Sequence, residues 1–451
     1  MSKTALVLVG DEGSNPDAVL LNRFLEERGF AVDTSRLDLS LESPNIPQIP
    51  NSPDLVILDL VSSPVENHAR LIECSGQLRA SEKFRETQIP IVAITAACEN
   101  QKLDLLSRFD DVFEAPITDE QFHARLQSLM RLSTMRREAV RRSKTSHKFG
   151  VGLPVLPPPR IIEDARFLVV GKGMTFLPLQ NAMPAGNSFI GALTQLMAET
   201  YLVHHTFDAI IIDMDEKQDH LIGFIESLRN NPRFFDLPIL VTCPESAVEL
   251  AVTALASGAT DLISFPFDRE QIFGRLMAMV REHRYRDQLG KLFREAKNLT
   301  PTDELTHLYS DKFFNEHLGA TITDCKDFQR PVTLAGFTIS VDGQNSTLNQ
   351  EQKETAIAKA GRVLQDLIRG EDMISRLDHE RFVAIFPDMT LESAATAVRR
   401  IRAVVNHTPV SLEINGNPIN LYLEGALIAI SGEETQETLI KQLFEEPEIS
   451  I

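Results

Sequence analysis

Short apolar segments rich in β-branched residues alternate with amphipathic segments over the first two thirds of the chain. Between the strand-like residues 6–9 and 31–34, apolar side chains recur at the spacing of one helix face (Val19, Leu20, Phe24, Leu25). Strands that are apolar throughout are typical of a parallel sheet covered by helices on both faces. We therefore predict an α/β fold with a doubly wound parallel sheet, in which the carboxyl end of each strand, including the one that ends at Asp59, lies along one edge.

The same pattern occurs twice. Three segments of the first copy have counterparts about 150 positions later, namely 53–59 in 207–213, 88–95 in 236–242 and 111–121 in 261–271. A spacing of this size indicates a duplicated domain rather than a short structural repeat. We expect two doubly wound domains in succession.

Residues 131–160 separate the two copies. The segment begins with arginines and lysines (Arg131, Arg136, Arg137, Arg141, Arg142, Lys144, Lys148) and ends in Pro154 and a proline run at 157–159. The proline run cannot be helical. The segment fits a solvated helix end followed by a stiff linker, and it also fits a basic patch that contacts an anionic ligand or partner.

A second connector spans about 277–300. Its apolar residues follow a 4-3-4-3 spacing (Tyr285, Leu289, Leu292, Ala296, Leu299). This is a seam of two heptads, which is short for an independent coiled coil. A helix that packs on its own domain and a stalk between two copies of the chain fit it equally well.

From Thr300 the pattern changes to α+β. A strand at 334–339 precedes an amphipathic helix, and a hairpin of residues 373–377 and 382–386 surrounds the turn Asp378-His379-Glu380-Arg381. The expected domains are a first receiver-like domain (1–137), a basic, proline-rich linker (138–160), a second domain (161–282), a connecting helix (283–299) and a C-terminal domain (300–451).

Composition narrows the range of partners. The formal net charge is −19, which argues against nucleic acid and anionic membranes as partners, because both require a basic surface. The four cysteines show no CxxC spacing, so neither a zinc site nor a disulfide framework is expected. No apolar run approaches the length of a membrane span, and we expect a cytoplasmic protein without membrane insertion.

The polar residues at the strand ends resemble those of the receiver domains of two-component signalling. The resemblance implies Asp59 as phosphoacceptor, Thr95 as the switch hydroxyl, and Asp11, Glu12 and Asp59 as ligands of Mg²⁺. Ala115 occupies the position where that family has a lysine that pairs with the phosphoryl group, so phosphorylation is expected to be weakened.

The second copy matches the receiver pattern at Asp213 and Thr242 only. Gly171 and Lys172 replace its acidic pair, and Phe265 stands at the lysine position. A domain without these carboxylates cannot hold the metal that phosphotransfer requires. We expect it to act as an adaptor or dimerisation module.

The C-terminal domain resembles the GGDEF domains that make cyclic di-GMP from two GTP molecules. The resemblance rests on residues 303–308 (DELTHL), similar to that family's DxLTGL motif, and on the hairpin at 375–382 (SRLDHERF). The order of domains resembles the PleD and PopA type of response regulator. This resemblance covers essentially the whole chain, with PopA, whose GGDEF domain is degenerate, as the nearer type.

The catalytic residues of that family are not retained. Asp378 and His379 replace the two glycines of the turn, Thr338 stands where a metal-binding acid is expected, and Arg381 replaces the turn's second acid, although Glu380 matches. The family's guanine-reading asparagine falls at Ser346, and its C-terminal KxxGRN segment is missing. Without a metal pair, the charge that develops on the α-phosphate has no counter-ion, so we predict no cyclase activity.

An RxxD pattern, Arg369 to Asp372, is retained at the family's distance from the hairpin turn. In GGDEF proteins this pattern often forms an inhibitory product-binding site, and the resemblance adds Arg400 as a third group. An arginine can contact guanine O6 and N7 in a bidentate manner, and a carboxylate can accept from guanine N–H groups. The alternative is a surface ion pair between residues i and i+3, worth at most about 0.5 kcal/mol.

We therefore expect a cyclic di-GMP receptor with an inactive GGDEF domain. The PopA type implies an adaptor in cell-cycle control that helps to deliver a transcription regulator to the ClpXP protease at a cell pole, through a further adaptor or polar localisation protein. A histidine kinase and a second copy of the chain are the other expected partners. The alternatives are a phosphorylation-activated diguanylate cyclase of the PleD type and a ligand-independent scaffold.

Overall fold

The structure is a computed structural model, and it describes residues 3–10, 16–37, 53–81, 84, 88–96, 108–115, 118–159, 162–172, 174–215, 220–341, 349–407, 410–414, 417–419 and 421–451. The chain divides into two compact units. The first comprises Ser2–Ser133 and Pro157–Asp287, and the second comprises Thr134–Leu156 and Gln288–Ile451 together with Met1.

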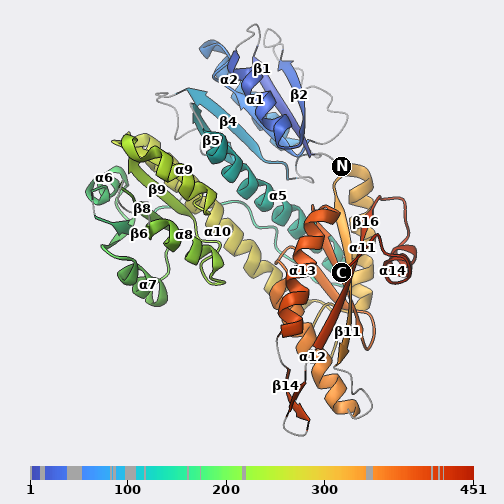
Figure 1. The fold of residues 1–451 in the computed structure, drawn as a ribbon. Helices are drawn as coiled ribbons and strands as arrows, with labels where there is room; N and C mark the ends of the chain where they lie inside the picture. Colours follow the sequence, from blue (N-terminus) through green and yellow to red (C-terminus); the bar gives the residue numbers. More distant parts are fainter. Residues whose placement is uncertain are drawn as a thin grey trace. The chain divides into compact units, whose positions relative to one another are not determined.

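The first unit begins with a doubly wound domain (blue to teal in Figure 1). Its elements are β1 (Lys3–Gly10), α1 (Pro16–Glu27), β2 (Phe30–Leu37), β3 (Leu55–Asp59), α2 (Val65–Ala80), β4 (Ile91–Ala96), β5 (Asp111–Ala115) and α5 (Asp119–Lys148). The five strands are parallel in the order β2-β1-β3-β4-β5. Alternate residues of the strands enter different apolar cores, Leu6 and Leu8 on one face and Val7 and Val9 on the other. The predicted sheet is confirmed.

The second domain of this unit (green in Figure 1) repeats the arrangement. Its elements are β6 (Arg166–Gly171), α6 (Phe176–Ala182), β7 (Ser188–Ala192), α7 (Gln195–His204), β8 (Ala209–Asp213), α8 (His220–Asn230), β9 (Ile239–Pro244), η1 (Glu245–Ala247), α9 (Val248–Ala256), β10 (Asp261–Phe265) and α10 (Arg269–Leu299). The order β10-β9-β8-β6-β7 is the same doubly wound order as in the first domain. The duplication that the sequence predicts is therefore present in the fold.

The second unit contains the C-terminal α+β domain (orange to red in Figure 1). Its elements are α11 (Asp311–Phe328), β11 (Val332–Val341), α12 (Gln350–Leu367), β12 (Met373–Arg376), β13 (Arg381–Pro387), α13 (Leu391–His407), β14 (Val410–Ile414), β15 (Asn417–Ile419), β16 (Leu421–Ile430), α14 (Gln436–Glu445) and β17 (Ile449–Ser450). The main sheet is antiparallel in the order β12-β13-β11-β16-β17.

Alternate residues of each strand point to opposite faces of this sheet, and each face has its own apolar core. Ala335 and Phe337 of β11 pack with α12 and α13, whereas Val332 and Leu334 pack with α11 and α14. Local sequence fixes where the helices begin: the Asn349 side chain forms a capping box with Gln352 at the start of α12. The hairpin of β12 and β13, which carries the Asp378 turn, lies at one edge of this packed sheet.

The helices that end the two doubly wound domains extend into the second unit. α5 is continuous to Lys148, so residues 138–148, which we predicted as linker, are helical. Arg137, Arg141 and Arg142 are buried, which contradicts the prediction of a solvated helix end. Arg137 and Arg141 have acidic partners in the C-terminal domain, Asp388 and Asp324, and the burial of these pairs explains why the helix continues.

The connector helix also packs within the chain. Leu289, Leu292 and Ala296 of α10 are buried, whereas Leu299 is 61% exposed. This burial favours the first of the two interpretations of the heptad seam, a helix packed on its own chain. Among the described residues, no helix is both long enough and apolar enough to cross a membrane.

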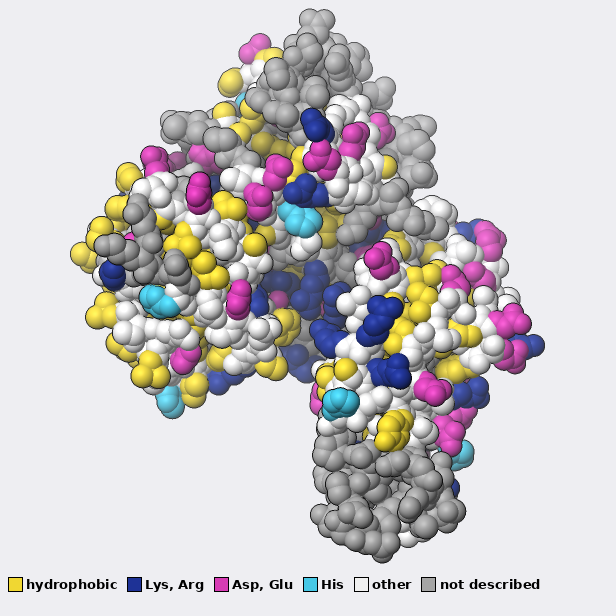
Figure 2. Space-filling model, viewed as in Figure 1, with side chains coloured by type: hydrophobic (Ala, Val, Ile, Leu, Met, Phe, Trp, Pro, Cys, Tyr) yellow, Lys and Arg dark blue, Asp and Glu magenta, His cyan; other side chains and the backbone are white. Residues whose placement is uncertain are grey.

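Large apolar side chains are exposed on the second doubly wound domain (left in Figure 2). Leu193, Leu196 and Val203, in and just before α7, are 66%, 73% and 55% exposed. Met174 and Leu177, near α6, are 71% and 64% exposed. α6 and α7 pack on different cores of this domain, so the side chains near α6 and those near α7 belong to different faces.

Candidate functional site

The first candidate site lies at the carboxyl end of β3. Asp59 is buried, and its Oδ1 accepts a hydrogen bond from the Ser62 main-chain N–H at 2.9 Å. In the parallel register Asp59 is opposite Ile94, so Thr95 on β4 is adjacent to that pair. The Thr95 hydroxyl is fully buried and donates to the Phe113 carbonyl oxygen at 3.4 Å. Asp59 and Thr95 therefore lie at the same edge of the sheet.

The remaining residues predicted for this site are Asp11, Glu12 and Ala115. Asp11 and Glu12 lie outside the described residues, so the Mg²⁺ ligand set stays a prediction. Ala115 ends β5 opposite Ala96, so a methyl group stands at the position to which the receiver resemblance assigns a lysine. Within the described ranges, no group of three or more His, Cys, Asp or Glu residues could hold a metal ion.

The second domain has a related but different cluster. Asp213 Oδ2 accepts from the Thr175 main-chain N–H at 3.2 Å, and Thr242 donates to Asp213 Oδ1 at 3.4 Å. Burial raises the pKa of Asp213, although these hydrogen bonds oppose the shift. Gly171 lies so close that a Cβ there would approach the Asp213 carbonyl oxygen to 2.5 Å. Thr175, which sequence reasoning did not single out, thus takes part in place of an acidic pair.

An ion-pair cluster joins the two doubly wound domains within the first unit. Arg125 of α5 pairs with Asp111 of its own domain and with the fully buried Asp261 of the second domain, and Arg275 also pairs with Asp261. Sequence reasoning missed this cluster. The duplication of the sequence could have indicated it. Asp111 and Asp261 occupy equivalent positions of the two copies, and so do Arg125 and Arg275.

The hairpin turn of the C-terminal domain is closed on itself. Asp378 Oδ1 accepts from the main-chain N–H groups of Glu380 and Arg381 at 3.0 and 2.9 Å, and Oδ2 accepts from Arg381 Nε at 2.7 Å. Partial burial opposes ionisation, yet these bonds lower the pKa of Asp378. Thr338 of β11 is opposite Arg381 in the antiparallel register. The turn therefore directs N–H donors at its own carboxylate.

The DELTHL segment is tied to the same hairpin. Asp303 accepts from Arg376 Nε at 3.0 Å and from Nη2 at 2.6 Å, a bidentate pair, and also from the Thr306 main-chain N–H and hydroxyl. Ser375 donates its hydroxyl to the Tyr309 carbonyl oxygen at 2.8 Å. This motif therefore acts here as a structural clasp for the hairpin.

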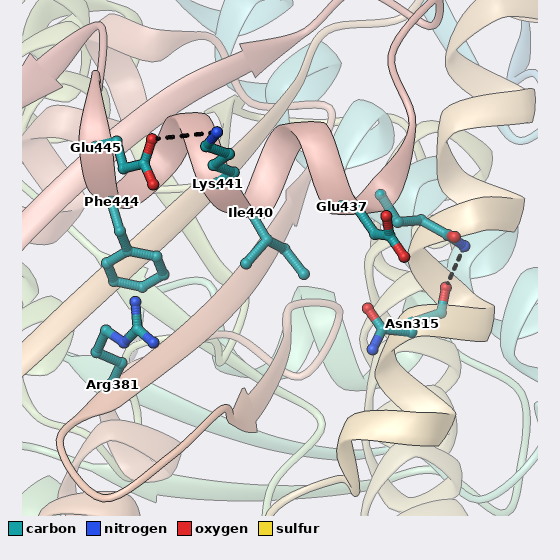
Figure 3. A pocket seen from close by; sticks show the side chains of 8 residues that line it. Asn315, Arg381, Glu437, Ile440, Lys441, Phe444 and Glu445 are labelled. Atoms are coloured by element: carbon teal, nitrogen blue, oxygen red, sulfur yellow. Dashed lines mark hydrogen bonds and ion pairs between the residues drawn. The ribbon is translucent and has the colours of Figure 1, made fainter.

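A cavity of about 490 Å³ lies beside the hairpin, between α11, β13 and α14 (Figure 3). Arg381 lies across the Phe444 ring, with 5.0 Å between the guanidinium carbon and the ring centroid. Lys441 pairs with Glu445 on the same wall. Of the charged side chains that line this cavity, Lys441 and Glu445 pair with each other, and Arg381 pairs with Asp378.

Arg369 and Asp372 do not form the surface ion pair that was the alternative to a ligand site. Asp372 is buried, and its Oδ2 accepts from the Arg369 main-chain N–H at 2.9 Å. Burial and the neighbouring Glu371 raise the pKa of Asp372 to about 8. Its Oδ1 has no hydrogen-bond partner within the described chain. The Arg369 side chain is exposed, and Arg400 is exposed on α13.

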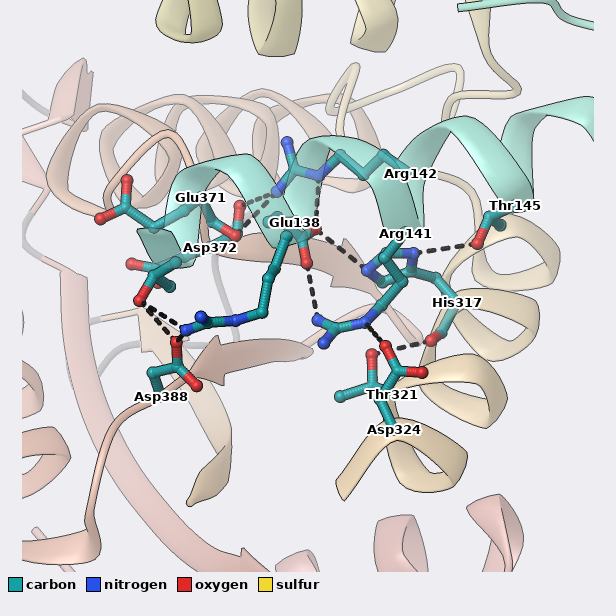
Figure 4. A network of polar contacts seen from close by, with 12 residues as sticks. Glu138, Arg141, Arg142, Thr145, His317, Thr321, Asp324, Glu371, Asp372 and Asp388 are labelled. Atoms are coloured by element: carbon teal, nitrogen blue, oxygen red, sulfur yellow. Dashed lines mark hydrogen bonds and ion pairs between the residues drawn. The ribbon is translucent and has the colours of Figure 1, made fainter. Parts of the chain in front are cut away.

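A buried polar network from α5 contacts this loop (Figure 4). Arg142 Nη2 donates to the carbonyl oxygens of Glu371 and Asp372 at 3.0 and 2.8 Å, and its Nε donates to Glu138 at 2.6 Å. Glu138 Oε1 also lies 3.0 Å from His317 Nε2. Sequence analysis identified Arg142 only as one of several basic residues and did not single out Glu138 or His317, because no local pattern links them to residue 372.

Burial alone would raise the pKa of Glu138, but His317, Arg142 and Arg141 outweigh it and lower the pKa to about 2. Burial lowers the pKa of His317. The network therefore holds the Glu138 carboxylate between the guanidinium groups of Arg141 and Arg142, with the His317 ring beside it.

Two doubly wound domains, each with an acid at the end of its third strand, are thus followed by an α+β domain with a closed hairpin turn. Residues 300–444 match the family model for "Diguanylate cyclase, GGDEF domain". Over 412 residues the chain is 24% identical to the response regulator PleD of Caulobacter vibrioides, covering 87% of this chain and 86% of PleD. The chain is thus similar to PleD along most of its length, and residues 300–444 match a GGDEF domain.

Shorter similarities accompany this one. The chain is 29% identical to the transcriptional regulatory protein PhoP of Escherichia coli over 99 residues, which cover 22% of this chain and 44% of PhoP. Among solved structures, the GGDEF domain of DgcB from Caulobacter crescentus in complex with c-di-GMP is 20% identical, with a TM-score of 0.29, and the match covers 32% of this chain and 82% of that one. The GGDEF domain of FimX from Pseudomonas aeruginosa is 19% identical with the same TM-score, covering 32% and 87%.

Proposed function

We propose that this chain is a catalytically inactive GGDEF protein that binds cyclic di-GMP at Arg369, with Asp372 and Arg400 as the other ligand-binding residues. The main observation in favour of an inactive domain is the closed hairpin turn. Asp378 occupies the N–H donors of the turn with its own carboxylate, so these donors are not free for a phosphate. A fixed negative charge there also repels a triphosphate.

The shortage of metal ligands at the turn supports the same conclusion. Thr338 has a hydroxyl in place of a metal-binding carboxylate and faces Arg381, a cation, across the strand pair. Divalent cations prefer several carboxylate oxygens, and Glu380 offers only one carboxylate. Phosphoryl chemistry at this turn would lack the charge stabilisation that metal ions supply.

Ligand binding is supported by the state of the RxxD loop. The Arg369 guanidinium makes no hydrogen bond or ion pair with the other described residues, so it is available for guanine or phosphate. Asp372 fixes the main chain of Arg369 by accepting its N–H, which sets the point from which the exposed Arg369 side chain projects. Arg400 adds positive charge from α13.

Titration calorimetry of the full chain with cyclic di-GMP tests this proposal. Wild type should bind, Arg369→Ala should lose at least about tenfold in affinity, and Arg362→Ala, an exposed arginine on α12, is the matched control. If neither wild type nor Arg369→Ala binds, the ligand-independent scaffold replaces this proposal.

The similarity to PleD favours one other function, a phosphorylation-activated diguanylate cyclase. Incubation with GTP and Mg²⁺, with and without a phosphoryl mimic, separates the two. Sustained formation of cyclic di-GMP would contradict the receptor proposal.

The wider role follows the PopA type. We propose that the ligand-bound chain is a regulatory adaptor, expected at a cell pole as a homodimer, that promotes proteolysis by ClpXP, and that a histidine kinase phosphorylates Asp59 with Mg²⁺ held by Asp11 and Glu12. The exposed apolar side chains near α7 support a protein contact. Pulse-chase proteomics in cells that carry Arg369→Ala should show a ClpXP substrate with a longer half-life. Unchanged half-lives for all of its substrates would refute the adaptor role.

A further inference from the structure

The main chain of the RxxD loop is held by one side chain from outside the loop. Arg142 of α5 is buried, and its Nη2 donates to two successive carbonyl oxygens, those of Glu371 and Asp372, at 3.0 and 2.8 Å (Figure 4). Hydrogen bonds from a charged donor are about twice as strong as neutral ones. Residues 371 and 372, which precede β12, are therefore fixed by α5.

Arg142 is itself held in a single orientation. Its Nε donates to Glu138, one helical turn earlier, at 2.6 Å, and its guanidinium lies 4.5 Å from the ring centroid of Phe293 on α10. A planar guanidinium can stack on a ring and donate in its own plane at the same time, which an ammonium group cannot do. The position of the donor is thus set by two helices.

The contact continues from Asp372 to Arg369. The Asp372 main-chain N–H donates to the Arg369 carbonyl oxygen at 3.1 Å, and the Asp372 carboxylate accepts from the Arg369 N–H at 2.9 Å. These two bonds close the four-residue turn from both ends. A shift of residue 372 would therefore move the backbone from which the Arg369 side chain projects.

We infer that Arg142 is a positioning residue for Arg369, and that the ligand site is competent only while the last turns of α5 are docked on the RxxD loop. This inference rests on the proposed binding of cyclic di-GMP. A site whose competent state is only partly populated loses affinity in proportion to that fraction. By linkage, bound ligand must in turn stabilise the docked state of α5.

Charge placement supports a role in positioning rather than in ligand contact. The Arg142 side chain is 3% exposed, and its donors are directed at protein oxygens. Glu138 neutralises its charge locally. Its effect on a ligand must therefore pass through the loop.

The test combines hydrogen exchange and calorimetry on the full chain. In Arg142→Gln, exchange at the amides of residues 369 and 372 should rise about tenfold, and the Kd for cyclic di-GMP should rise by a similar factor. Arg142→Lys keeps the charge but cannot reproduce the fork, so it should restore affinity only in part. Lys148→Ala, an exposed residue of the same helix, is the control and should change neither quantity.

The two readouts separate this inference from the proposed function. If wild type does not bind cyclic di-GMP, the proposed function fails, whereas the exchange data still decide whether Arg142 holds the loop. A general loss of structure would raise exchange throughout β11 as well, and Arg142→Lys then provides the comparison. Unchanged exchange and affinity in Arg142→Gln would overturn the inference.

Discussion

Asp378 and Arg381, at the two ends of the hairpin turn, are joined by two hydrogen bonds. The Asp378 carboxylate accepts from the Arg381 main-chain N–H at 2.9 Å and from its side-chain Nε at 2.7 Å. The guanidinium of Arg381 also lies over the ring of Phe444. The turn is thereby a closed, internally neutralised structure, and this has consequences for catalysis that mutagenesis can measure.

Restoring the glycines alone should not restore cyclase activity. In Asp378→Gly/His379→Gly the N–H donors of the turn become free, but Thr338 still provides no metal ligand, so no cyclic di-GMP should form from GTP and Mg²⁺. Chromatography of the reaction mixture measures the product. Product from this double variant would show that the turn alone blocks catalysis, and the variant with Thr338→Asp in addition measures what the second carboxylate contributes.

The clasp between Asp303 and Arg376 should contribute to stability. Both side chains are 18% exposed and the pair is bidentate, so Arg376→Ala should lower the free energy of unfolding of the C-terminal domain by about 2 kcal/mol. Urea denaturation followed by circular dichroism measures the change. Lys441→Ala breaks an exposed pair with Glu445 and should cost no more than about 0.5 kcal/mol. Equal effects of the two substitutions would contradict the clasp.

Glu138 should make the protein sensitive to acid. Its pKa falls from 4.5 to about 2 on folding, so its ionised form stabilises the folded state above about pH 4.5, and this contribution is lost as the pH falls toward 2. The loss should amount to about 3 kcal/mol in wild type. Free energies of unfolding measured across this range should fall less steeply in Glu138→Gln.

The control for Glu138 is an exposed carboxylate of the same unit. Glu316→Gln removes a side chain that is 42% exposed and pairs with Lys148, and it should leave the pH profile of wild type almost unchanged. A Glu138→Gln profile parallel to that of wild type would show that the network does not perturb this carboxyl group.

Ala115 should limit phosphorylation of the first receiver-like domain. Ala115→Lys introduces an ammonium group at the end of β5, near the edge where Asp59 lies, and should increase the yield and lifetime of the aspartyl phosphate formed from acetyl phosphate. Gel-shift electrophoresis measures the fraction that is phosphorylated. Asp59→Asn in the same background should abolish the signal, and an unchanged yield in Ala115→Lys would rule out a limiting role for the missing cation.

Much of the fold follows from short-range patterns. The alternation of apolar runs and amphipathic helices predicts both parallel sheets, because a strand buried on two faces must be apolar at consecutive positions. The hairpin around Asp378 follows from period-two alternation on either side of a polar turn. The same reasoning brought Asp59 and Thr95 to one sheet edge, since parallel strands share their carboxyl ends.

The basic segment after residue 131 shows where such reasoning ends. Its charges and prolines fit a linker, yet Arg142 is buried against loop residues more than two hundred positions away. Nothing within the segment indicates an acidic partner such as Asp388 for Arg137, since the pairing depends on how α5 packs. The sequence left a solvated helix end and a basic patch both open, whereas the partners of the arginines depend on the tertiary packing of α5.

The sequence by itself determined the duplicated doubly wound domains, the α+β domain that follows them, and the hairpin with its polar turn at Asp378 and His379, because each of these depends on neighbouring residues or on a repeated pattern. Only the tertiary structure decided that Asp378 binds its own turn, that Asp372 is buried instead of paired with the Arg369 side chain, and that Arg142 holds their loop. Those relationships depend on burial and on contacts between distant segments. Such contacts arise when helices and sheets pack, and no local spacing encodes them.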